Sequence, residues 1–151
     1  MIKGCSFVSL VTLEQSGYLR AWPLASSQQE YDGNLWFFVS NDSPAIANVE
    51  CDPQVCLVYT QVAQADVVSV SGSALVVTHI AQKQQLWNPV AQAWFPQGPT
   101  AGSLVLLRVA VERAEYWDAR SNRLVRFSTK SKTWNIDPDL AYSNGQRLLT
   151  I

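Results

Sequence analysis

The chain of 151 residues has the length of one domain and, with 48% apolar residues, can bury a hydrophobic core without help from a metal or a disulfide. A formal net charge of −1 gives no basic excess of the kind that nucleic acids and anionic membranes attract, so we expect neither partner. The three cysteines share no spacing with the single histidine, so no disulfide framework or metal site is expected. Unpaired thiols, no cleavage-site pattern near the start and no apolar run near the roughly 20 residues of a membrane helix indicate a cytoplasmic protein.

The first part of the chain predicts three strands and a helix. Residues 6–14 are β-branched and aromatic with rough alternation, and the turn QSG at 15–17 separates them from YLRAWPLA at 18–25, which predicts a β-hairpin. Residues 35–40, LWFFVS, are apolar at successive positions, which predicts a central strand covered on both faces. Ser43 as N-cap and Pro44 as first helical residue then predict a short helix that stops before Pro53.

The second part continues the strand pattern. Strands are predicted at 54–61 and 66–80, with Gly72 marking a bulge or bend, and two short helices at 81–95, because Asn88-Pro89 interrupts the helical spacing. Residues 103–118 predict a strand pair or one bent strand, and 124–135 the returning strand.

Strands and helices in this order do not alternate as βαβ units would. The pattern predicts a mainly β fold, an antiparallel β-barrel of about six or seven strands with short helices plugging its ends. We expect the barrel domain to span residues 1–135 and the weakly patterned residues 136–151 to form a loosely held C-terminal tail.

One segment is a candidate anion site. In SNDSP, at 40–44, the hydroxyls of Ser40 and Ser43, the amide of Asn41 and the first N–H groups of the helix form a cluster of donors, and the helix dipole favours an anion there. An N-cap with ordinary polar loop residues explains the same letters. A single histidine excludes a catalytic triad, and no residue is identified as a catalytic acid or base.

Successive blocks of the sequence resemble the bacterial general stress protein family, a branch of the pyridoxamine 5′-phosphate oxidase-like flavoproteins. The blocks are GYLRAWPLA at 17–25, DGNLWFFVSNDSPAIANVECDPQVCLVY at 32–59, VSVSG at 68–72, LWNPVAQAWFPQG at 86–98 and LVLLRVAVERAEYWDA at 104–119. The resemblance implies an FMN-binding split barrel that acts as a homodimer, with flavin sites in the subunit interface and oxidoreductase activity on a small molecule that the sequence does not identify.

The resemblance also implies where the flavin is bound. It places the flavin ring against the end of the strand 36–40 and the phosphate at the loop and helix start that follow. It assigns flavin contacts to Phe38, Val39, Ser40 and Ser43, borders the site with Trp94 and Trp117, and leaves Arg20 as the nearby cation for the phosphate.

Two departures from the family pattern leave an alternative open. Family members carry arginine and lysine, the cations of the phosphate site, where this chain has Trp22 and Ala45, and no lysine or arginine occurs between Arg20 and Lys83. The alternative is a dimeric split-barrel binding or interaction protein that has lost FMN.

Overall fold

The computed structural model describes residues 7–26, 31–62, 65–118, 123–129 and 133–136. The expected C-terminal tail lies outside the described residues except for its first residue, Ile136. The expected domain boundary near residue 135 therefore stays a prediction.

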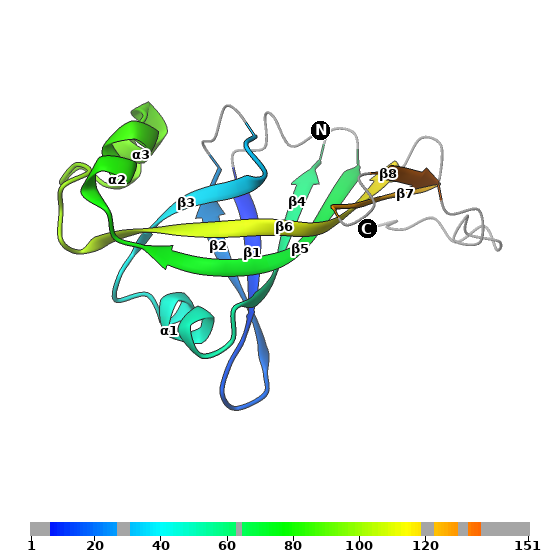
Figure 1. Ribbon diagram of the computed structural model, residues 1–151, viewed down its shortest axis with the longest axis horizontal. Coiled ribbons are helices and arrows are strands. Elements are labelled where there is room, and N and C mark those ends of the chain that lie inside the picture. Colours follow the sequence, from blue (N-terminus) through cyan, green and yellow to red (C-terminus); the bar gives the residue numbers. More distant parts are fainter. Residues whose placement is uncertain (1–6, 27–30, 63–64, 119–122, 130–132, 137–151) are drawn as a thin grey trace.

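The predicted fold class is confirmed: the described chain is an antiparallel sheet that curls into a split barrel, with three short helices (Figure 1). The strands are β1 (Phe7–Leu13), β2 (Leu19–Ala25), β3 (Asn34–Ser40), β4 (Gln54–Gln61), β5 (Asp66–Val77), β6 (Leu104–Asp118), β7 (Arg123–Ser128) and β8 (Thr133–Ile136). Their order in the sheet is β2-β1-β4-β5-β6-β7-β8, and β3 pairs with β6. Eight strands replace the expected six or seven, because the predicted returning strand is a hairpin of β7 and β8.

The apolar residues of β3 predicted a central strand, but among the described strands β3 pairs with β6 alone. It pairs with the first half of β6 and β7 pairs with the second half, so the two strands share one edge of that long strand. Leu35, Phe37 and Val39 point into the core, whereas Trp36 and Phe38 lie half-buried on the outer face. The run of successive apolar residues therefore reflects two different environments, a packed core and a partly open aromatic surface.

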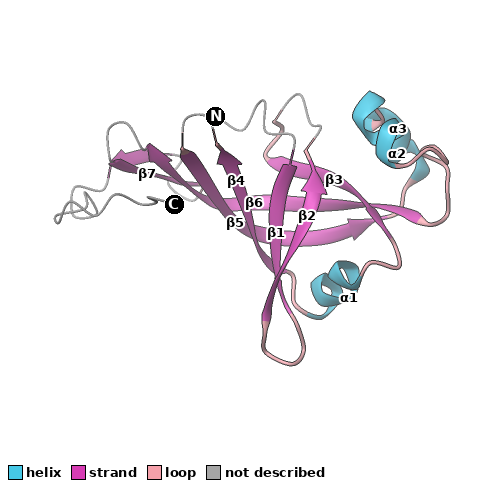
Figure 2. Cartoon of the chain, turned by 180° about the vertical axis from the view of Figure 1, so that it is seen from behind, coloured by secondary structure: helices cyan, strands magenta, loops and turns pink. Residues whose placement is uncertain are grey.

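The predicted helices are confirmed. They are α1 (Pro44–Cys51), α2 (Ile80–Leu86) and α3 (Pro89–Trp94), and the N-cap residues of α1 and α3 are Ser43 and Asn88. Figure 2 shows α1 on one side of the β5–β6 ribbon and the α2–α3 pair on the other, near the end of β6 where β3 joins it. No helix in the described ranges is long and apolar enough to cross a membrane.

The core lies inside the barrel and is closed by α1. Ile46 and Val49 of that helix are buried in the same cluster as Leu10 of β1 and Leu57 of β4. A second buried set lies outside this cluster, since Leu104 and Leu106 of β6 are both buried without belonging to it. Successive side chains of a strand point to opposite faces, so this second set places an apolar layer on the outer face of β6.

Candidate functional site

The polar turn after β3 is fastened to the loop that precedes β6. The Asn41 side-chain amide donates to the carbonyl of Gly102 at 3.2 Å, and the Asn41 backbone N–H donates to the carbonyl of Ser103 at 2.8 Å. The Ser40 hydroxyl donates to the carboxylate of Asp42 at 2.5 Å. The donors that the sequence placed together are therefore together, but they bond to the chain itself.

The first turn of α1 uses its N–H groups in the same way. The Ser43 hydroxyl accepts from the Ala45 N–H at 3.3 Å, and the Ser43 carbonyl accepts from the Ile46 N–H at 2.9 Å. Pro44 has no N–H to offer. This is the N-cap arrangement that the sequence left open as an alternative to an anion site.

Lys83 is the buried cation of this region. It lies on α2, and its ammonium group donates to the carbonyls of Leu104 at 2.9 Å and Ala101 at 3.3 Å. Burial of a lysine is unusual, and here hydrogen bonds to carbonyls compensate for the lost hydration. Lys83 and Asn41 thus both hold the loop before β6, Lys83 through Ala101 and Leu104 and Asn41 through Gly102 and Ser103.

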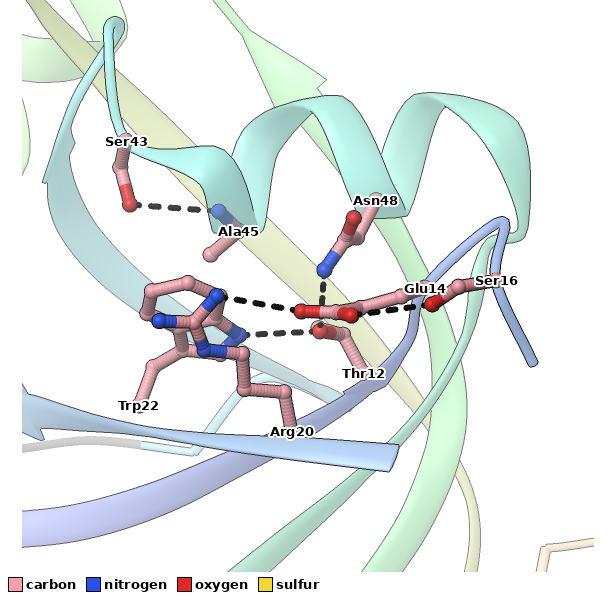
Figure 3. Close-up of polar contacts among 8 residues, drawn as sticks. All are labelled: Thr12, Glu14, Ser16, Arg20, Trp22, Ser43, Ala45 and Asn48. Carbon is pink, nitrogen blue, oxygen red and sulfur yellow. Dashed lines mark hydrogen bonds and ion pairs between the residues drawn. The ribbon is translucent and has the colours of Figure 1, made fainter. Parts of the chain in front are cut away.

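The Trp22 indole lies near the start of α1, at the position where the resemblance implies an arginine that binds the phosphate. The Trp22 Nε1–H donates to the Thr12 hydroxyl at 2.9 Å, and the Asn48 amide of α1 donates to the same oxygen at 3.0 Å (Figure 3). Trp22 also packs against the core cluster. Thr12 therefore joins β1, β2 and α1 at one buried point, which we call the Thr12 node: Thr12, Trp22 and Asn48.

Arg20 is engaged with its own neighbours in β1 and β2. Its guanidinium lies 4.5 Å from the centre of the Trp22 ring and donates to Glu14 at 3.1 Å. Glu14 accepts a second hydrogen bond, from the Ser16 hydroxyl at 3.1 Å. The ion pair is exposed and contributes little stability, but the Glu14 carboxylate neutralises the charge of Arg20.

These residues do not fit the phosphate of FMN. A dianion needs unused donors and neighbouring positive charge. The turn instead presents the carboxylate of Asp42, the donors of Ser40 and Asn41 are used within the chain, and Glu14 balances the charge of Arg20.

The remaining predicted site residues are spread over the molecule. Phe38 packs edge-on against Trp87, with ring centres 5.0 Å apart, whereas the Val39 side chain is in the core and the Val39 backbone pairs with Val105 of β6. Trp94 is exposed and packs against Phe7, with ring centres 5.7 Å apart. Trp117 lies on the far half of β6.

Trp117 and Ser40 belong to opposite ends of the barrel. Ser40 pairs with Leu104, the first residue of β6, and Trp117 is thirteen positions further along the same strand. At about 3.3 Å per residue the separation along β6 is roughly 40 Å. The two residues cannot contact one ligand within a single chain.

Sequence reasoning missed Thr12, Asn48 and Glu14. A signal for Thr12 was present, because it follows Val8 and Leu10 on the inward positions of β1, where a polar residue needs a buried hydrogen-bond partner. Asn48 and Glu14 have no comparable local signal, since their partners lie on other elements.

Two further observations limit the chemistry of the described residues. No group of three or more histidine, cysteine, aspartate or glutamate side chains lies close enough together in them to hold a metal ion. Just before β3, burial and then the charge of Asp32 raise the pKa of Tyr31 above its usual value of 10.0, so its hydroxyl is protonated at neutral pH.

Comparisons with known proteins agree with the fold. A family model described as pyridoxamine 5′-phosphate oxidase like matches residues 1–137. The general stress FMN/FAD binding protein from Xanthomonas citri is 30% identical, covers 78% of this chain with 82% of its own, and superimposes with a TM-score of 0.66. A putative general stress family protein from Xanthomonas campestris is 28% identical, with coverages of 78% and 81% and a TM-score of 0.63.

A more distant relative shows the same fold. A protein related to general stress protein 26, from Clostridium acetobutylicum, is 14% identical and superimposes with a TM-score of 0.76 over 87% of this chain and 92% of its own. A search of curated proteins gave no match. The split barrel, the ordered sequence blocks and a family model that covers all the described residues lead to one conclusion: the chain belongs to the pyridoxamine 5′-phosphate oxidase-like family.

Proposed function

We propose that the protein binds a flavin ring at the end of β3 and acts as a homodimer. The observation that carries the proposal is the outer edge of β3 around Phe38, along which no described strand pairs with β3. Among the described strands β3 forms a ladder with β6 and with no other, so alternate residues direct backbone N–H and C=O groups away from the sheet.

The outer edge of β3 around Phe38 suits a flavin because the pyrimidine side of a flavin ring carries both hydrogen-bond donors and acceptors. The half-buried Phe38 and Trp87 add an aromatic surface beside this edge, as is common where flat ligands bind. The Xanthomonas citri protein, which is 30% identical to this chain, is an FMN/FAD binding protein, and this supports a flavin as the ligand class.

A second copy of the chain is part of the proposal. On the outer face, Arg108 of β6 lies between Trp36 of β3 and Leu75 of β5 in the strand register. Leu75 is 51% exposed, and the Arg108 Nε is buried without a hydrogen-bond partner in the described part of the chain. An exposed leucine beside an unsatisfied buried donor favours a protein interface on these barrel strands. A second chain also brings a Trp117 toward a Phe38 that its own chain cannot reach.

Redox chemistry, in this proposal, is supplied by the bound flavin, and the protein contributes binding and orientation. The protein is then an oxidoreductase of a small molecule whose identity its described side chains do not specify. A second candidate function is a dimeric binding or interaction protein that uses no flavin. The Thr12 node and the Arg20–Glu14 pair favour it, because they fill the place of a phosphate site.

The visible absorption spectrum of the purified protein, recorded with and without added riboflavin, FMN and FAD, separates the two candidates. A perturbed flavin spectrum with saturable binding is expected. A spectrum identical to that of free flavin at every protein concentration would favour the binding protein without flavin.

A further inference from the structure

We infer that the corner below the start of α1 selects against a phosphate, so that the flavin taken by this protein has an uncharged ribityl tail, as in riboflavin. The inference rests on the proposed flavin function and specifies its ligand. Its basis is the set of contacts at this corner, formed by the turn 40–43, the Thr12 node and the pair of Arg20 with Glu14. Figure 3 shows the node and the pair together with Ser43 of the turn.

The Trp22 indole occupies the space at this corner. The Trp22 indole is held by the Thr12 hydroxyl, and that hydroxyl is held in turn by Asn48 of α1. Trp22 packs on the core, so rotating the indole away would break this hydrogen bond and expose apolar surface. The ring, with the Arg20 guanidinium over it, is therefore a fixed part of the corner, and it occupies the position where the family carries a phosphate cation.

Two carboxylates contribute negative charge to this corner. Asp42 places a carboxylate in the turn, bonded to the Ser40 hydroxyl. Glu14 adds a second carboxylate, and Arg20 is the described cation that balances one of the two. These three charges sum to −1. The Lys83 ammonium is buried and directed at the carbonyls of Ala101 and Leu104, and Arg20 is paired with Glu14, so both described cations of this region are already engaged within the chain. A phosphate dianion therefore meets the Asp42 carboxylate with no unengaged cation to pair with, whereas the hydroxyls of a ribityl chain need none.

The N–H donors of the turn and the helix start are already used within the chain. The Asn41 amide, the Asn41 N–H and the Ala45 N–H are bonded to Gly102, Ser103 and Ser43 respectively. A phosphate would have to displace these bonds to gain its own. A ribityl hydroxyl can donate to Asp42 as the corner stands, so a neutral tail binds without rearrangement.

The test compares riboflavin with FMN by fluorescence titration of the full chain. We expect riboflavin to bind about tenfold more tightly than FMN, since like charges brought together disfavour the phosphorylated ligand. Raising the ionic strength from about 0.05 M to about 0.5 M is expected to narrow this difference, because salt screens the repulsion, and to leave riboflavin binding nearly unchanged.

Charge-neutral variants test the assignment to this corner without disturbing the core. Asp42→Asn and Glu14→Gln are each expected to strengthen FMN binding severalfold and to change riboflavin binding by less than about twofold. Glu112→Gln is the matched control. Glu112 is exposed on β6, eight residues beyond Leu104 and so roughly 26 Å along the strand, and its loss is expected to change neither affinity.

The outcomes are distinct. FMN bound as tightly as riboflavin, or more tightly, would overturn the inference and leave the flavin function standing. A preference for riboflavin that neither salt nor the two variants change would place the selection elsewhere and also overturn it. Failure of both flavins to bind would reject the inference together with the proposed function.

Discussion

At the scale of single residues, Ala45 shows how burial changes the meaning of a substitution. Sequence reasoning treats a lysine at this position as a cation in the first turn of a helix, at a cost of about 0.3–1 kcal/mol. In the structure the Ala45 side chain is 1% exposed and belongs to the core cluster. A lysine there must bury its chain or push neighbours aside, which is a different and larger effect.

We predict that Ala45→Lys lowers the free energy of unfolding by about 1–3 kcal/mol, as other core substitutions that add volume do. Ala47→Lys is the control, because Ala47 is exposed in the same turn of α1 and carries the dipole effect without the burial. Urea unfolding of both variants measures the difference. Equal stability losses would show that the dipole, and not packing, decides the cost at this corner.

The residue scale also shows why the candidate site was only partly predictable. The letters SNDSP correctly predicted the N-cap at Ser43 and the helix start at Pro44. Whether Asn41 is free to bind an anion depends on the carbonyls of Gly102 and Ser103, which lie about sixty residues later in the chain. Local sequence identifies a donor, whereas its partner is set by the tertiary fold.

At the scale of elements, Gly72 is the position where the predicted bulge is confirmed. The register between β5 and β6 shifts between Ser71 and Gly72. A methyl group on Gly72 would lie 2.2 Å from the carbonyl oxygen of Ala110, so the two backbones approach closely here. The glycine is thus needed for the bend that lets two long strands wrap around the core.

We predict that Gly72→Ala destabilises the protein by at least about 2 kcal/mol, since the clash is with backbone and cannot be relieved by rotating a side chain. Gly102→Ala is the comparison, because a methyl group on Gly102 meets no atom within 4 Å. Thermal unfolding followed by circular dichroism measures both. A Gly72→Ala protein as stable as Gly102→Ala would contradict the close approach of β5 and β6.

Element positions were harder to predict than element types. Strands and helices follow from periodicity and caps, so the hairpin of β1 and β2 and all three helices were predictable from local letters. The place of β3 in the sheet was not, because Trp36 and Phe38 read as core residues although they lie half-buried on the outer face. An apolar residue type indicates that the side chain is shielded from water. It does not indicate whether the core of its own barrel or another surface covers the side chain.

At the scale of the whole molecule, the length of β6 determines how a site could be completed. Phe38 pairs with Leu106 near one end of this strand, and Trp117 lies eleven positions further on, roughly 36 Å away along the strand. If both residues contact one flavin, they come from different subunits. The proposed homodimer therefore makes a prediction that a site within one chain does not make.

The prediction concerns mixtures of two variants, Phe38→Ala and Trp117→Leu, each of which alone is expected to weaken flavin binding in both sites of the dimer. Unfolding and refolding an equimolar mixture gives heterodimers in about half of all dimers by random pairing. In a heterodimer one site carries both substitutions and the other carries neither, so about a quarter of all sites regain wild-type affinity. Flavin titration measures this fraction, and circular dichroism of each variant checks that it folds. If mixing restores no tight sites, while each variant alone binds weakly and forms dimers, then Phe38 and Trp117 do not share a flavin across the interface.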